Sequence, residues 1–332
     1  MRAAFLYGSE CAGAQSPAGL AGEFDSHRCH HPAKRRRSSP VPLHGIATRA
    51  AAPADGIVVC PSRGKEKNYF LQEEKQMTII AIANQKGGVG KTTTTVNVAA
   101  GLVSQDKKVL CIDFDPQCHL SKYVGHKFDA GYTITDFIFA KSDYRELPPT
   151  EGLIRHTPFG IDYIPSSLRL SKGERALAHA MFPERVLQEI LKVIIPEGYD
   201  YVLIDCNPSM GLLMTNALTT SNRVLIPVQT EEFSVDGLSD MMELVQMVKA
   251  NINPSLDILG LLPTLMANNN DCREVADWLR KEFPSLTFST GIGRYVDAPR
   301  SAKARRPVIG SKSKLAEQYM AATMELLQRL EG

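Results

Sequence analysis

Short runs of apolar, often β-branched residues alternate along the chain with longer segments in which apolar residues recur at helical spacing. The runs predict buried strands and the segments predict amphipathic helices. The predicted strands cover residues 78–84, 108–113, 161–165, 201–205, 223–228, 256–262 and a short 287–290. The predicted helices cover 92–104, 171–195 (one or two helices), 210–220, 234–251, 271–283 and 313–330. Such alternation indicates a single α/β domain with a mostly parallel, twisted sheet and helices on both faces.

Residues 1–76 do not share this pattern. They are rich in Ala, Gly, Pro and Ser and show no sustained period, so we expect them to be disordered. The basic run at 34–37 could be a localisation or nucleic-acid-binding patch, but such a short run is typical of a solvated segment. The His and Cys residues at 27–31 match no zinc-ligand spacing. The acidic residues argue against a transit peptide.

Everything recognisable begins at Met77, where the first predicted strand starts. Codons for residues 72–74 (Gln-Glu-Glu) can contain a purine-rich ribosome-binding sequence just before the Met77 codon. We therefore hypothesise that residues 1–76 are upstream sequence translated from a start placed too early. The native start would then be Met77 and the single domain would cover residues 77–332.

The composition excludes several classes of protein. With 332 residues, 43% hydrophobic and 22% charged, the chain is neither wholly disordered nor collagen-like nor a disulfide scaffold. No apolar run approaches the ~20 residues of a membrane helix, and seven irregularly spaced cysteines are typical of reduced thiols in the cytoplasm. The net charge of +2 is uneven, because eleven Lys/Arg and seven Asp/Glu in residues 1–76 leave −2 for the remainder.

A glycine-rich loop joins the first predicted strand to the first predicted helix. Glycine lets backbone N–H groups curl around phosphate oxygens, and the helix N-terminus faces the same anion. In such a P-loop, Lys91 can reach the β- and γ-phosphates and the Thr92 hydroxyl can ligate Mg²⁺. The predicted nucleotide-binding residues are Lys86, Gly87, Gly88, Val89, Gly90, Lys91, Thr92 and Thr93.

The loop departs from the standard pattern Gly-x-x-x-x-Gly-Lys-Ser/Thr, whose first glycine is absent, and it carries a second lysine, Lys86. One lysine is enough to bind the phosphates of the same chain. Two interpretations of Lys86 stay open: a solvated surface lysine, or a lysine presented to the nucleotide of a second subunit.

Acidic residues stand at the ends of two predicted strands. Asp113 and Asp115 end strand 108–113, and Asp205 ends strand 201–205. In an open parallel sheet the carboxyl ends of the strands face the ligand crevice, so we expect the three carboxylates to converge on the phosphates. A carboxylate after such a strand commonly holds Mg²⁺, often through water.

Together these segments resemble the ParA/MinD family of deviant-Walker-A P-loop ATPases, in particular its ParA (Soj-like) branch of chromosome and plasmid partitioning proteins. The resemblance runs from about Met77 to the C-terminus. It is carried by residues 86–93 (KGGVGKTT), 113–117 (DFDPQ), 199–209 (YDYVLIDCNPS), 227–231 (PVQTE) with 237–238 (GL), and 294–307.

The resemblance implies an ATP-dependent homodimer that uses ATP and Mg²⁺. Lys86 would cross to the partner's phosphates, Asp115 would position the attacking water, and both would be catalytic. Thr92, Asp113 and Asp205 would form the metal environment. Hydrolysis would be slow until a ParB-like partner stimulates it. The ATP-bound dimer would bind DNA without sequence preference. We therefore expect a cytoplasmic protein that is associated with the nucleoid when it carries ATP.

The sequence departs from the family pattern at two places near the phosphates. Cys118, His119 and Leu120 stand where the family usually has Gly-Asn-Ala/Leu, and Asn207 stands where it usually has proline. A loop substitution without chemical role is our interpretation of His119. These changes leave the details of the loop after Asp115 open.

A cluster of basic residues in 294–306 contains one acid, Asp297. In a domain of net negative charge, such a cluster favours salt-dependent binding to DNA phosphates, although a solvated loop is the alternative. The predicted DNA-binding residues are Arg294, Arg300, Lys303, Arg305 and Arg306.

Two other functions within the same superfamily are possible. A MinD-like ATPase that cycles on a membrane or positions another cargo needs a basic amphipathic C-terminal helix, but residues 324–332 have mixed charge and no basic run, so we expect no stable membrane association. An iron–sulfur reductase component needs two suitably placed cysteines per subunit, and Cys111, Cys118, Cys206 and Cys272 offer no such arrangement.

Overall fold

The computed structural model describes residues 77–128, 131–231 and 235–331. The expectations for residues 1–76, disorder and a non-native start, lie outside the described residues. None of the helices in these ranges has the length and apolarity needed to cross a bilayer.

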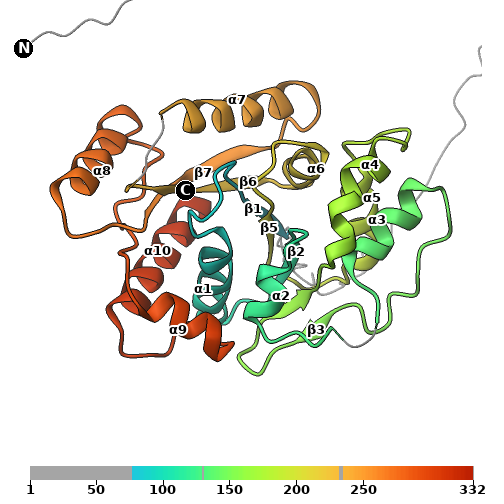
Figure 1. Ribbon diagram of the computed structural model, residues 1–332, viewed down its shortest axis with the longest axis horizontal. Coiled ribbons are helices and arrows are strands. Elements are labelled where there is room, and N and C mark those ends of the chain that lie inside the picture. Colours follow the sequence, from blue (N-terminus) through green and yellow to red (C-terminus); the bar gives the residue numbers. More distant parts are fainter. Residues whose placement is uncertain (1–76, 129–130, 232–234, 332) are drawn as a thin grey trace, which may run out of the picture. The chain divides into compact units, whose positions relative to one another are not determined.

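The described strands form one sheet in the order β3-β4-β2-β5-β1-β6-β7 (Figure 1). All neighbouring pairs are parallel except β3 with β4. This confirms the mostly parallel α/β sheet predicted from the apolar runs. The strands are β1 (Thr78–Ile82), β2 (Val109–Phe114), β3 (Arg155–His156), β4 (Asp162–Ile164), β5 (Tyr201–Cys206), β6 (Arg223–Gln229) and β7 (Asp257–Thr264).

Helices cover both faces of the sheet because side chains alternate across each strand. Ile80 and Ile82 of β1 belong to the core cluster that includes residues of α1 and α10, whereas Ala81 belongs to the cluster that includes residues of α3, α5, α6 and α7. Figure 1 shows helices on both faces of the sheet. The helices are α1 (Lys91–Val103), α2 (His119–Tyr123), α3 (Ile134–Ser142), α4 (Gly173–Leu177), α5 (Val186–Ile194), α6 (Leu212–Thr220), α7 (Val235–Asn251), α8 (Asn270–Glu282), α9 (Asp297–Ala304) and α10 (Lys314–Glu331), with a 3₁₀ helix, η1 (Leu168–Lys172).

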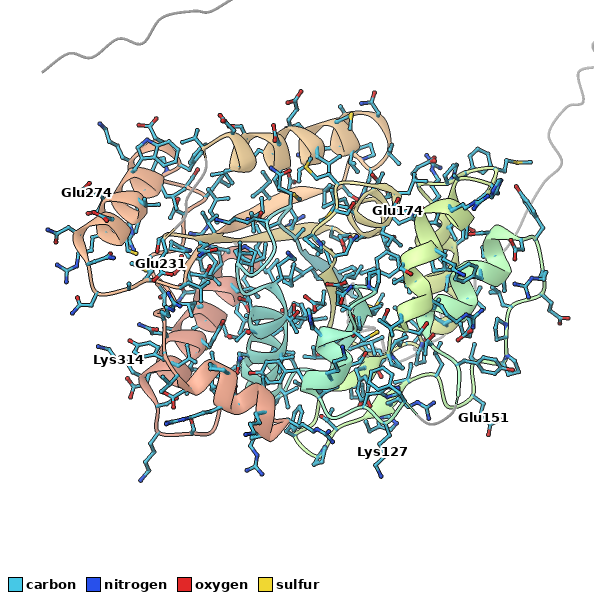
Figure 2. All side chains as sticks on the ribbon, in the orientation of Figure 1. Lys127, Glu151, Glu174, Glu231, Glu274 and Lys314 are labelled. Atoms are coloured by element: carbon cyan, nitrogen blue, oxygen red, sulfur yellow. The ribbon has the colours of Figure 1, made fainter. Side chains whose placement is uncertain are left out.

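The structure differs from the sequence prediction in the shorter elements. The predicted helix 171–195 is divided into η1, α4 and α5, and Glu174 of α4 (Figure 2) accepts hydrogen bonds from two amides at the start of α6. The predicted strand 287–290 makes only an isolated bridge between Thr287 and Leu261. Helices α2, α3 and α9 lie in segments for which the sequence analysis predicted no helix.

Helix α1 packs closely against α10 at Gly101. A Cβ atom at this position would overlap the side chain of Thr323, which is fully buried and donates a hydrogen bond to the Tyr319 carbonyl at 2.8 Å. Because both helices are held by the apolar face of the sheet, neither can move away without opening the core. Gly101 therefore fixes the distance between α1 and α10.

We predict that Gly101→Ala lowers the free energy of unfolding by about 1–3 kcal/mol, because the added methyl overpacks this contact. Chemical denaturation would measure the change. The double variant Gly101→Ala/Thr323→Ala should recover part of the loss relative to the sum of the single variants. An increase in stability on Gly101→Ala, as expected for an unobstructed helix position, would contradict the close contact.

Candidate functional site

The loop between β1 and α1 is shaped to receive an anion. Gly88 and Gly90 have φ values of 78° and 90°, a backbone region that favours glycine, and a Cβ on either would meet nothing within 4 Å. The N-cap residue of α1 is Gly90, so no N-cap side chain bonds to the first amides of the helix. The first turn carries no acidic residue either. Since the first amides of a helix lack intrahelical acceptors, this end offers N–H groups and a partial positive charge to a ligand.

The loop is held from both sides by hydrogen bonds. The Asn84 side chain donates to the Pro227 carbonyl at 2.7 Å and accepts from the Lys86 amide at 2.9 Å. The Thr264 hydroxyl donates to the Val89 carbonyl at 2.8 Å. These contacts join the loop to the ends of β6 and β7, so the loop is organised before a ligand arrives.

The two lysines of the loop have different surroundings. Lys91 is buried and its ammonium donates to the carbonyls of Asn84 at 3.0 Å and Lys86 at 2.9 Å. Burial lowers the pKa of Lys91, and the negative charge of Asp205 opposes that shift. Lys86 is half-buried and does not line the cavity described below, as far as the described residues show.

Asp113 and Asp205 lie opposite each other in the register of β2 and β5, and both are buried. The Thr92 hydroxyl donates to Asp205 Oδ2 at 2.7 Å and thereby ties α1 to the end of β5. Asp113 Oδ2 accepts from both the backbone and the hydroxyl of Ser121 in α2, at 2.8 and 2.5 Å. The structure therefore brings these two acids together, with Asp113 bonded to α2 and Asp205 to α1.

Burial is the largest cause of raised pKa values in this pair. It raises the pKa of Asp205 to about 8 and that of Asp113 to about 6, and repulsion from Asp113 adds to the shift of Asp205. The positive charge of Lys91 opposes the shift of Asp205 without cancelling it, and a divalent cation would supply further positive charge.

The donor set fits a magnesium ion that is held partly by phosphate. Within the described ranges, no three His, Cys, Asp or Glu side chains form a metal cluster by themselves. Mg²⁺ in nucleotide sites is typically bound by one or two protein groups, waters and phosphate oxygens. Thr92 and Asp205, hydrogen-bonded to each other beside the loop, could provide such groups.

A cavity of about 460 Å³ opens in front of the loop. Its walls come from the loop and α1, from the segment after β2, from Pro208 after β5, and from Ala302 of α9. Asp115, predicted to act on the attacking water, lies on this wall together with His119 and Lys122. The lining residues are Gly87, Gly88, Gly90, Lys91, Thr92, Thr93, Asp115, Gln117, His119, Lys122, Tyr123, Pro208 and Ala302.

Comparison with known proteins identifies this arrangement. A family model described as an AAA domain matches residues 77–258. The chain is 36% identical over 252 residues to the sporulation initiation inhibitor protein Soj of Bacillus subtilis, covering 75% of this chain and 97% of that protein. It is 36% identical over 256 residues to the chromosome partitioning protein ParA of Myxococcus xanthus, covering 76% of this chain and 88% of that protein.

A solved structure is similar as well. Cobyrinic acid a,c-diamide synthase from Mycobacterium smegmatis, crystallised with an ATP analogue and magnesium, shares 28% identity at a TM-score of 0.65. The match covers 77% of this chain and 97% of that one. The chain belongs to the ParA/MinD family of P-loop ATPases.

This ATPase has a second cavity, of about 420 Å³, which the sequence analysis did not identify. Its lining combines Gly90 and Thr93 of the P-loop with Thr264 and Leu265 at the end of β7, with residues 292–296, and with Tyr319 of α10. Segment 294–307, one of those that carry the resemblance to the ParA/MinD family, could have indicated this cavity, but the sequence analysis interpreted it only as a basic surface.

The structure separates Arg294 from the other predicted DNA-binding residues. Arg294 lines the second cavity, and its Nη1 donates to both carboxylate oxygens of Glu231 (labelled in Figure 2), at 2.8 and 2.6 Å. Arg300 and Lys303 lie on α9, and Arg305 and Arg306 follow its end. These four are exposed, and we call them the α9 basic cluster.

In this ATPase we predict that Asp205→Asn stabilises the unliganded protein at alkaline pH. A folded-state pKa of about 8, above the ordinary 3.8, means that the folded protein binds more protons, so the contribution of Asp205 to stability is lost as pH rises toward 8. The melting temperature without nucleotide and with EDTA should therefore exceed that of wild type at about pH 8, and the difference should shrink toward about pH 5.

Asp277→Asn on the exposed α8 is the matched control and should show no such pH-dependent gain. A melting temperature of Asp205→Asn that stays below wild type at both pH values would contradict the costly buried carboxylate.

Proposed function

We propose that this ATPase is a DNA partitioning protein switched by ATP. ATP with Mg²⁺ binds the P-loop, the loaded chain forms a homodimer that binds DNA without sequence preference, and a ParB-like DNA-binding partner stimulates the slow hydrolysis that releases it. The observation that carries the proposal is the P-loop cavity, which is shared by Asp115 and by the helix of the α9 basic cluster.

The described side chains have distinct parts in this proposal. The amides of the loop and of the first turn of α1 hold the phosphates, and Lys91 places its charge against the β- and γ-phosphates. Thr92 and Asp205 hold Mg²⁺, directly or through water, and Asp113 fixes the segment that carries Asp115. Bound Mg²⁺ neutralises charge that develops on the phosphates. Asp115 accepts a hydrogen bond from the attacking water.

The contact between α2 and α9 supports a link from nucleotide to DNA. The Tyr123 hydroxyl of α2 and the Ser301 hydroxyl of α9 are hydrogen-bonded at 2.5 Å, and Ala302 lines the nucleotide cavity. A nucleotide-dependent shift of the segment after β2 would therefore move α9 and, with it, the α9 basic cluster. This arrangement favours DNA as the ligand that responds to ATP.

We predict that Lys91→Ala and Lys86→Ala fail at different steps. Lys91→Ala removes the buried ammonium of the cavity and should weaken binding of a fluorescent ATP analogue by about tenfold or more. Lys86→Ala should keep that affinity but lose the ATP-dependent doubling of mass in light scattering and the stimulated turnover. Lys281→Ala on exposed α8 is the control. Unchanged turnover in both variants would contradict the site.

We also predict that Arg300→Glu/Arg305→Glu lowers DNA affinity by about tenfold or more and reduces its salt dependence, because phosphate contacts are lost. ATP affinity should be unchanged. The double reversal Arg273→Glu/Lys281→Glu on α8 changes the net charge equally and is the matched control. Equal loss of DNA affinity in both double variants would mean that overall charge, rather than the α9 basic cluster, determines binding.

A further inference from the structure

Asn207, the residue directly after β5, has a buried polar atom without a partner. The residue is 5% exposed, and no donor in the described part of the chain reaches its Oδ1 atom. Buried amide oxygens in folded proteins are nearly always hydrogen-bonded, because an unpaired one has lost its water without replacement. Pro208, the residue next to Asn207, lines the P-loop cavity, so a ligand in that cavity is a candidate source of the missing partner.

The position of Asn207 follows from the pairing of β2 with β5. Asp113 lies opposite Asp205, and side chains two residues apart along a strand share a face. The registered pairs end at Phe114 and Cys206. Asp115 and Asn207 are the next residues after the two strands; if the alternation continues by one residue, both side chains lie on the α1 face. Pro208, the next residue, lines the cavity. Asn207 thus belongs to the row of polar groups at these strand ends.

The neighbouring polar groups are already committed to other bonds. Asp205 accepts from Thr92, and Asp113 accepts from Ser121. Asp115 Oδ1 accepts from the Gln117 amide at 2.8 Å. Asn207 brings an acceptor to this place where the family pattern usually has proline, which has no side-chain amide.

We propose that the side-chain amide of Asn207, together with Asp115, holds the water molecule that attacks ATP. This rests on the proposed ATPase function of the cavity. The amide oxygen and the Asp115 carboxylate each accept one hydrogen of the water, which leaves a lone pair directed at the γ-phosphorus. The new bond joins the water oxygen to that phosphorus. The bond to the bridging oxygen breaks, its electron pair stays on ADP, and the proton leaves with the phosphate.

The test compares binding of a ground-state and a transition-state ligand. The probes are a fluorescent ADP analogue with Mg²⁺, alone and with aluminium fluoride, which mimics the phosphoryl group in flight with water opposite. For Asn207→Ala and Asn207→Pro we expect ADP affinity within about twofold of wild type and affinity with aluminium fluoride lower by about tenfold, the effect of one lost hydrogen bond. The kcat for ATP should fall similarly while KM is unchanged.

The matched control is Thr219→Val, which removes another buried, unpartnered oxygen on α6. It should bind both ligands as wild type does. Wild-type affinity for ADP with aluminium fluoride in both Asn207 variants would overturn the proposal. An equal loss of affinity for ADP alone, with a lower melting temperature, would also overturn it in favour of a structural role. Failure of the wild type to bind ATP would instead overturn the proposed function.

Discussion

The hydrogen bond from the Thr92 hydroxyl to Asp205 joins the first turn of α1 to the end of the central strand β5. Around it, the sheet is apolar on both faces, so the polar ends of β2 and β5 and the N-terminus of α1 form a single polar region over the core. Burial there disfavours the charged form of Asp205 and raises its pKa. A cation and an anion would complete the site, because the Asp205 pKa stays raised even beside Lys91 and the first amides of α1 lack intrahelical acceptors.

From this bond, contacts lead outward to the surface. Asp113 beside Asp205 holds Ser121 of α2, and Tyr123 of α2 bonds to Ser301 of α9. Each link is a hydrogen bond between buried side chains rather than a flexible surface pair. The nucleotide cavity and the α9 basic cluster are therefore connected over a few residues, as the proposed switch requires.

The sequence predicted the longer strands and the P-loop because both depend on local chemistry, but it missed the two-residue β3 and predicted a strand at 287–290 that makes only an isolated bridge. Apolar β-branched runs specify buried strands, and glycines at Gly88 and Gly90 permit the turn that the helix start requires. Helix α2 is too short to produce a periodic pattern. Cys118, the residue before it, has a left-handed backbone conformation, which a cysteine in a sequence does not indicate. Helix α9 shows no apolar period, because Pro299 lies in its first turn and Ser301 is its one buried residue.

Other features depend on tertiary contacts and could not be predicted locally. The pairing of Arg294 with Glu231 joins residues 63 positions apart, so the sequence grouped Arg294 with the basic residues that follow it. Asn207 was visible as a departure from the family pattern, but its unpartnered oxygen depends on the packing of neighbouring strand ends. The sequence shows which side chains are present, but their hydrogen-bond partners depend on the tertiary structure.

The central claim is that the polar region at the strand ends is completed by ATP and Mg²⁺ together. Its most direct test is the melting temperature of the wild-type protein at about pH 8 with ATP and Mg²⁺, compared with ATP and EDTA. The account predicts a clear rise only when both are present, because the cation offsets the buried carboxylates and the phosphates occupy the helix end. An equal rise with EDTA, or none in either condition, would contradict it.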